Sequence, residues 1–200
     1  GKFISIKQLA DETVKLKFIE GITKSISEII QQNNTYKKII FHIPQKLNKD
    51  EIQTIENILA KTSENIELSI IKINDKSDFI GFNADKNSLV PYESSYVQIS
   101  DKQYLIWTEG LNFHNSKAIK RYGNPLHIDF HYSNKVESFK NHKAYLQDIL
   151  NLSGANYRGF NAKSLPVSSF YPKLIADFSK HFKELNLSLI TKDTEKPWFL

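Results

Sequence analysis

A short apolar segment with two histidines and an aspartate has the right residue types for a metal site. His127, Asp129 and His131 alternate with apolar residues, so their side chains would share one face of a β-strand. Imidazole and carboxylate groups on one face are ligands that a divalent metal ion accepts. The alternative is a solvated face opposite a buried one. We favour this second interpretation because no further ligand cluster lies nearby in the sequence.

The sequence lacks the motifs of several enzyme classes. It contains no Gly-rich phosphate loop, no HExxH zinc motif and no nucleophile elbow. Hydrolysis with two metal ions would need a carboxylate at a strand end near the first helix. An apolar run at residues 37–43 reads as that strand, but it ends at Pro44 and Gln45 without an acid. The absence of cysteine also excludes disulfides and thiolate metal sites.

Basic residues are concentrated in the second half of the chain. The net charge is +5; residues 1–100 hold 13 Lys or Arg against 13 Asp or Glu, and residues 101–200 hold 14 against 9. This distribution favours a polyanion such as nucleic acid as the partner. A lysine-rich surface without any partner would have the same composition.

No apolar run approaches the roughly 18 residues that would span a membrane, and no signal-peptide pattern is present. We therefore expect a cytoplasmic protein. The sequence has no methionine, so we expect it to be a piece of a longer or processed chain.

The chain ends at residues 196–200 on an apolar, aromatic segment that begins with Lys196 and follows a polar stretch. A disordered tail would be polar, so we expect this segment to pack against the protein and to hold the terminal carboxylate of Leu200 at a defined position. That carboxylate would form either a structural ion pair or part of an anion or metal site.

Periodicity predicts alternating helices and strands in the first third of the chain. Apolar residues recur at spacings of three and four over residues 13–32, and again from a cap at Asn48 or Asp50 through Lys61. Short apolar runs at residues 37–43 and 66–71 predict strands. This order is typical of an α/β layer with a mainly parallel sheet.

The rest of the chain predicts more strands and two further helices. Candidate strands lie at residues 79–82, 96–99, 103–108 and 125–132, and the second and third of these form a hairpin. Helices are expected at residues 140–152 and 168–185. There is no internal repeat and no linker, so residues 1–200 are expected to form one α/β domain.

Several segments, in this order, resemble the PIWI domain of Argonaute proteins. Residues 156–174 resemble its C-terminal signature, in which a basic residue precedes a Ser-Leu-Pro turn and an aromatic stretch opens the last helix. Residues 13–42 resemble the family's helix and strand before its catalytic turn. Residues 89–110 and 123–128 resemble its hairpin and the strand that follows. The resemblance covers nearly the whole chain.

This resemblance implies an RNase H-like fold, a mixed sheet flanked by helices. The chain would be the C-terminal part of a PIWI domain, with the MID domain and the first PIWI strands upstream of it. Active members hold two metal ions with Asp, Glu, Asp and a variable fourth residue. Pro44 takes the place of the second Asp, and Lys173 falls at the fourth position. We therefore expect no nuclease activity, and no enzyme.

Inactive domains of this kind resemble those of short prokaryotic Argonautes. The resemblance implies a module that binds a guide RNA or DNA and its target strand. It would regulate an associated TIR-type, sirtuin-type or nuclease effector in defence against invading DNA. Positions that would bind nucleic acid are Arg158, Lys163, Ser164, Lys173 and Lys180. The Leu200 carboxylate would hold a Mg²⁺ ion that bridges the 5′ phosphates of the guide. The alternatives are an active Argonaute-type endonuclease that slices the target strand with displaced ligands, and a domain used only for protein contacts.

Overall fold

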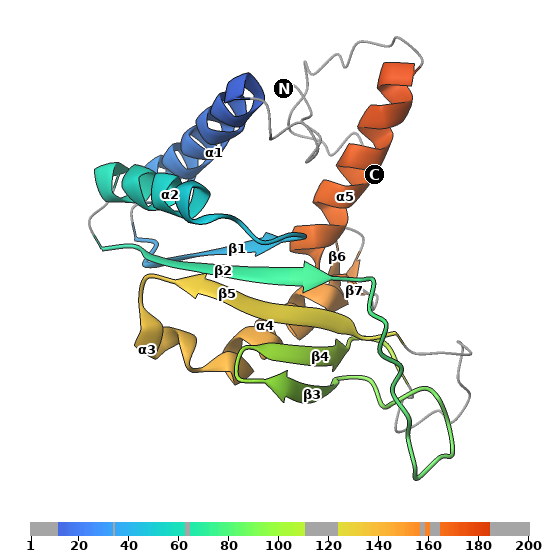
Figure 1. Ribbon diagram of the computed structural model, residues 1–200. Helices are drawn as coiled ribbons and strands as arrows, with labels where there is room; N and C mark the ends of the chain where they lie inside the picture. Colours follow the sequence, from blue (N-terminus) through green and yellow to red (C-terminus); the bar gives the residue numbers. More distant parts are fainter. Residues whose placement is uncertain are drawn as a thin grey trace.

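A computed structural model describes residues 12–33, 35–62, 65–110, 124–156, 159–160 and 165–184. Five helices and seven strands are assigned within these ranges (Figure 1). The helices are α1 (Glu12–Gln32), α2 (Lys49–Thr62), α3 (Val136–Phe139), α4 (His142–Gly154) and α5 (Val167–Glu184). The strands are β1 (Lys38–Ile43), β2 (Glu67–Asn74), β3 (Ser95–Ser100), β4 (Gln103–Trp107), β5 (Leu126–Ser133), β6 (Ala155–Asn156) and β7 (Gly159–Phe160).

Five strands form one mixed sheet in the order β1-β2-β5-β4-β3. Only β1 and β2 are parallel, and the other three pairs are antiparallel. The mainly parallel sheet expected from the first four elements holds only for that one pair, and the mixed sheet that the resemblance implied is confirmed. A parallel neighbour needs a long crossover such as α2, whereas β3 and β4 are joined by a tight turn that reverses the chain.

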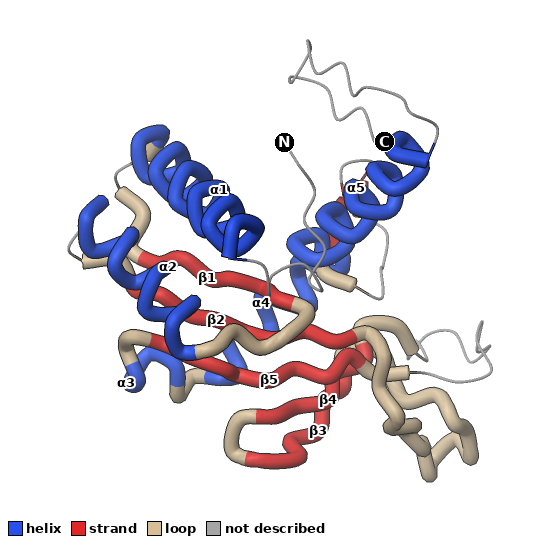
Figure 2. The backbone as a smooth tube through the Cα atoms, turned by 45° about the horizontal axis from the view of Figure 1, so that its top comes forward, coloured by secondary structure: helices blue, strands red, loops and turns tan. Residues whose placement is uncertain are grey.

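The segment between β2 and β3 is a long excursion away from the sheet (Figure 2). The strand expected at residues 79–82 is not formed. In its place Asn83 and Ser88 make a single antiparallel bridge, with amide–carbonyl bonds of 2.7 and 3.1 Å. Apolar residues here were mistaken for a strand because a short apolar run does not reveal whether a neighbouring strand is available.

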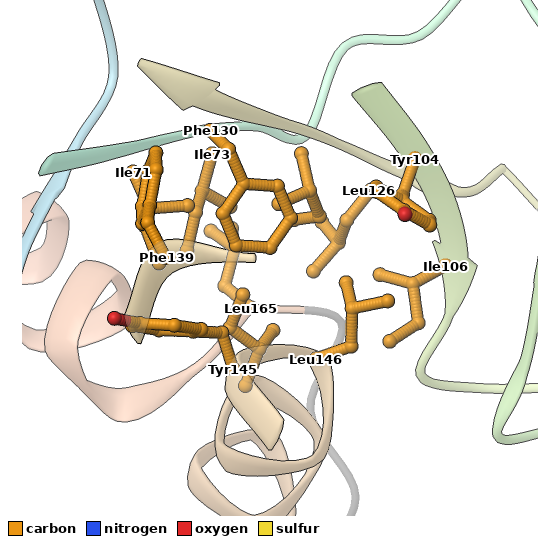
Figure 3. Packing of buried hydrophobic residues seen from close by; sticks show 12 residues of the cluster. Ile71, Ile73, Tyr104, Ile106, Leu126, Phe130, Phe139, Tyr145, Leu146 and Leu165 are labelled. Atoms are coloured by element: carbon orange, nitrogen blue, oxygen red, sulfur yellow. The ribbon is translucent and has the colours of Figure 1, made fainter. Parts of the chain in front are cut away.

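Each face of the sheet is covered by helices. On one face α1 and α2 enclose a core of seven buried residues: Ile26, Ile30, Ile55, Leu59, Ile66, Leu68 and Ile70. On the other face α3 and α4 pack against β2, β4 and β5, and Tyr145 and Leu146 of α4 point toward the sheet (Figure 3). Strand β2 supplies both cores because alternate residues point to opposite faces.

Local sequence explains where α2 begins. The Asn48 side chain accepts a hydrogen bond from the Glu51 amide at 2.9 Å, and the Glu51 carboxylate accepts one from the Asn48 amide at 2.8 Å. This reciprocal arrangement satisfies two amides that the first turn leaves free. None of the helices in the described ranges is long and apolar enough to cross a membrane.

Candidate nucleic-acid interface

The first half of α5 is fixed against the carboxyl ends of β1 and β2. These two strands are parallel, so their ends meet at one edge of the sheet. His42, near the end of β1, shares a hydrogen bond of 2.6 Å between its Nδ1 and the Ser168 hydroxyl of α5. Figure 1 shows α5 rising from this edge. The helix that carries the expected phosphate-binding lysines is therefore anchored at the sheet edge.

His42 is held neutral in this contact. Burial lowers the pKa of His42 to about 4, against the opposing influence of the Asp148 carboxylate. A neutral imidazole can donate or accept through Nδ1, and the Ser168 hydroxyl suits either role. The contact therefore persists across the physiological pH range without a charge on the ring.

Lys173 makes the second contact between α5 and the sheet edge. Its ammonium lies 2.7 Å from the carboxylate of Asp75, which directly follows β2. Lys173, which was expected to bind nucleic acid, is the seventh residue of α5. The anion beside it is a carboxylate of the same chain. More than half of the Lys173 side chain remains exposed, so a phosphate can still reach it.

Pro44 directly follows β1, and the next residues cross over the face of β5. Lys46 forms an ion pair of 2.8 Å with Asp129, and the Gln103 amide donates to the same carboxylate at 3.2 Å. The imidazole of His131 donates from Nε2 to the Leu47 carbonyl at 2.9 Å. A short segment after β1 thus supplies partners to two of the three residues expected to share a strand face.

These partners decide between the two interpretations of that strand face. We had favoured a solvated face. Asp129 is instead buried, with 6% of its surface exposed, so that interpretation is wrong at this residue. Burial alone would raise the pKa of Asp129, but the Lys46 ammonium and the Gln103 amide outweigh it and the pKa lies below its usual value. The carboxylate is ionised and its counter-cation is a lysine.

His127 differs from its two neighbours on the strand. Its Nε2 is buried and has no hydrogen-bond partner among the described residues, and its ring lies edge-on to Phe79 at 6.4 Å between centroids. Across the described ranges no group of three or more His, Asp or Glu is placed to hold a metal ion. His127, Asp129 and His131 therefore share a face, as predicted, without converging on one point.

The remaining predicted site residues cannot be placed. Arg158, Lys163, Ser164 and Leu200 lie outside the described residues, and so does the side chain of Lys180 within α5. The implied Mg²⁺ site at the Leu200 carboxylate stays a prediction for the same reason.

Sequence reasoning missed three contacts at this edge: His42 with Ser168, Lys173 with Asp75, and Lys46 with Asp129. The partners in these pairs are 126, 98 and 83 positions apart respectively, so no local spacing could reveal them.

No protein-family model matches the chain. A Piwi protein of Archaeoglobus fulgidus is 28% identical over 181 residues, which cover 82% of this chain and 38% of that protein. Among solved structures, Clostridium butyricum Argonaute bound to a guide DNA and a 19-mer target DNA matches 90% of this chain and 21% of its own, with a TM-score of 0.62 and 20% identity. The A. aeolicus Argonaute structure gives a TM-score of 0.55 and 17% identity, covering 80% of this chain and 21% of its own.

The sequence is thus similar to a Piwi protein, and the fold, a mixed sheet flanked by helices, is similar to that of solved Argonaute structures. This confirms the resemblance that the residues themselves carry. The chain spans well under half the length of the relatives it matches.

Proposed function

We propose that this chain is the guide- and target-binding part of a catalytically silent prokaryotic Argonaute that regulates an associated effector. The observation that carries the proposal is the match of 90% of the chain to an Argonaute described with both a guide and a target strand. This similarity supports guide-dependent nucleic-acid binding. The proposal also includes the lack of nuclease activity and the regulation of an effector, and each of these is argued separately.

The anchored first half of α5 supports a role in binding phosphate. Lys173 is held at the sheet edge by Asp75 but stays more than half exposed. A phosphate approaching Lys173 would meet a fixed ammonium group that has already lost part of its rotamer freedom. Arg158, Lys163, Ser164 and Lys180 are proposed to extend the same surface, and Mg²⁺ held by the Leu200 carboxylate would neutralise the guide 5′ phosphates.

Two features support catalytic silence. Pro44 stands at the end of β1, where the family resemblance places a metal-binding carboxylate, and proline has no side-chain oxygen. On β5, which is separated from β1 by β2 in the sheet, the buried Asp129 carboxylate is already paired with Lys46. In-line phosphodiester cleavage by two metal ions needs carboxylates that are free to hold both ions.

The binding half of the proposal is tested with the full-length protein and a guide–target duplex. Changing Arg158→Ala together with Lys173→Ala should weaken duplex affinity about tenfold or more at moderate salt. The slope of log affinity against log salt concentration should also become shallower by about two, because two phosphate contacts are lost. Lys140→Ala is the matched control, because Lys140 is 66% exposed and lies in the segment between α3 and α4. Unchanged affinity in the double variant would show that the proposed surface is wrong.

Magnesium and the effector have separate tests. If Mg²⁺ bridges the guide phosphates to the Leu200 carboxylate, chelation with EDTA should weaken binding of a 5′-phosphorylated guide and leave a 5′-hydroxyl guide unaffected. Equal sensitivity of the two guides would remove the metal from the proposal. Regulation predicts that an associated effector is active only when guide and target are both present.

A further inference from the structure

The ion pair between Lys173 and Asp75 joins α5 to the segment that leads away from β2. The two residues are 98 positions apart in the sequence, and Nζ of Lys173 donates to Oδ2 of Asp75 at 2.7 Å. Asp177 lies four residues after Lys173 on α5, the spacing at which side chains on a helix surface are neighbours. Lys173 therefore has an acidic neighbour on its own helix, yet its ammonium lies against a carboxylate from a distant segment.

The first half of α5 also has other attachments to the rest of the fold. Ser168 shares a hydrogen bond of 2.6 Å with His42 of β1, and Phe170 packs against the core that α4 forms with the sheet. Water reaches the Lys173–Asp75 pair, since 55% of the lysine side chain and 31% of the aspartate side chain are exposed. Ion pairs of this kind contribute little to stability. Stability alone therefore gives no strong reason for the pair.

The pair does have a consequence for any anion that approaches α5. The exposed Lys173 ammonium has three N–H donors, one of which is directed to Asp75. A phosphate bound to the same ammonium would either displace the Asp75 carboxylate or lie within a few ångströms of its negative charge. Both alternatives cost affinity, because the first breaks an ion pair and the second brings two anions together.

We propose that Asp75 is an autoinhibitory residue, which competes with nucleic-acid phosphate for the Lys173 ammonium. This inference rests on the proposed function, in which Lys173 binds a backbone phosphate. A duplex held by other basic residues would overcome the competition, whereas an isolated phosphate would bind poorly at Lys173.

Asp75 has two opposite effects on binding at Lys173. It restricts the motion of the lysine, which favours binding, and its charge opposes the phosphate. The charge should dominate, because the Lys173 side chain is more than half exposed and so keeps much of its rotamer freedom. Removal of the carboxylate should therefore strengthen the binding of nucleic acid.

The test measures the affinity of the full-length protein for a guide–target duplex at moderate salt. Asp75→Asn keeps the shape of the side chain and removes its charge, so it should raise the affinity about three- to tenfold. Asp75→Ala is a second variant and should also raise it. Asp78→Asn is the matched control, because Asp78 is an exposed acidic residue three positions further along the same segment. This control removes the same charge and should change the affinity by less than about twofold.

A double-mutant cycle shows whether Asp75 acts through Lys173. In a Lys173→Ala background no ammonium holds a phosphate beside residue 75, so Asp75→Asn should raise the affinity by less than about twofold. A gain of the same size with and without Lys173 would show that the carboxylate repels the duplex independently of the lysine, and would overturn the proposal.

Failure of this inference is distinguishable from failure of the proposed function. If Lys173→Ala weakens duplex binding but neither Asp75 variant strengthens it, the autoinhibitory role of Asp75 is overturned and the proposed function stands. If the wild type does not bind the duplex, or Lys173→Ala leaves its affinity unchanged, both the phosphate site at Lys173 and the role of Asp75 are overturned.

Discussion

At the scale of single residues, the sheet edge is organised by pairs that the chain makes with itself. Asp129 has its charge balanced by Lys46, and Lys173 has its charge balanced by Asp75. The first pair fixes the segment after β1 over the sheet, and the second fixes α5 beside β2. The Lys46 ammonium thus occupies the place beside the buried Asp129 carboxylate that a metal ion would need. For this reason we propose that this part of the protein binds nucleic acid without cutting it.

The pair between Lys46 and Asp129 should contribute to stability. Lys46→Met would leave a buried carboxylate without its counter-charge, and we expect a loss of about 1–3 kcal/mol in the free energy of unfolding. The lower end applies if solvent reaches the site, since half of the Lys46 side chain is exposed. Urea unfolding at neutral pH measures it.

Lys140→Met removes an ion pair with Glu137 of similar length, 2.7 Å against 2.8 Å, whose partners are both exposed. That control should change stability by less than about 0.5 kcal/mol. Similar losses in the two variants would show that the Asp129 pair has no special role.

His42 predicts a pH dependence of stability. Its folded-state pKa of about 4 lies below the usual 6.5, so the unfolded chain takes up a proton first as the pH falls. The protein should therefore lose stability between pH 6.5 and 4, by at most about 3 kcal/mol from this group. His42→Gln should flatten the profile in this window, although His142, whose pKa is also lowered, will leave some slope. Thermal unfolding at pH 7 and pH 5 tests this, and identical slopes in wild type and variant would contradict it.

At the scale of elements, much of the fold could be predicted from the sequence. Apolar spacing located α1 and α2, and Asn48 was correctly identified as one of two candidate caps. The partners of the strands could not be predicted, because pairing depends on contacts between distant segments. For the same reason residues 79–82 were taken for a strand, and the partners of Lys173 and Asp129 were not anticipated.

The excursion between β2 and β3 is a packed element, as two contrasting glycines show. A Cβ on Gly81 would lie 2.2 Å from Pro91 Cγ and 2.6 Å from Trp107 Cζ2, whereas a Cβ on Gly21 in α1 would meet nothing within 4 Å. We expect Gly81→Ala to destabilise the protein by about 1–3 kcal/mol through overpacking. Gly21→Ala should stabilise it by about 0.5–1 kcal/mol through helix propensity. If both changes have the same sign in urea unfolding, the excursion is not packed against β4 as described.

At the scale of the whole molecule, the chain combines an Argonaute-like fold with an uneven charge distribution. The basic excess lies in residues 101–200, which include α5, and the uncharged strand β3 lies at the opposite end of the sheet order from β1. We therefore propose the α5 side of the molecule as the surface that binds nucleic acid.

The most direct test of the central claim follows a labelled target strand through one experiment with the guide-loaded full-length protein in Mg²⁺ and in Mn²⁺. The retained complex is isolated on a native gel and its target is then sized under denaturing conditions. We expect a complex that forms only with a complementary guide, dissociates as salt rises, and holds an intact target in both metals. A target cut at one defined position, or no complex at low salt, would contradict the account.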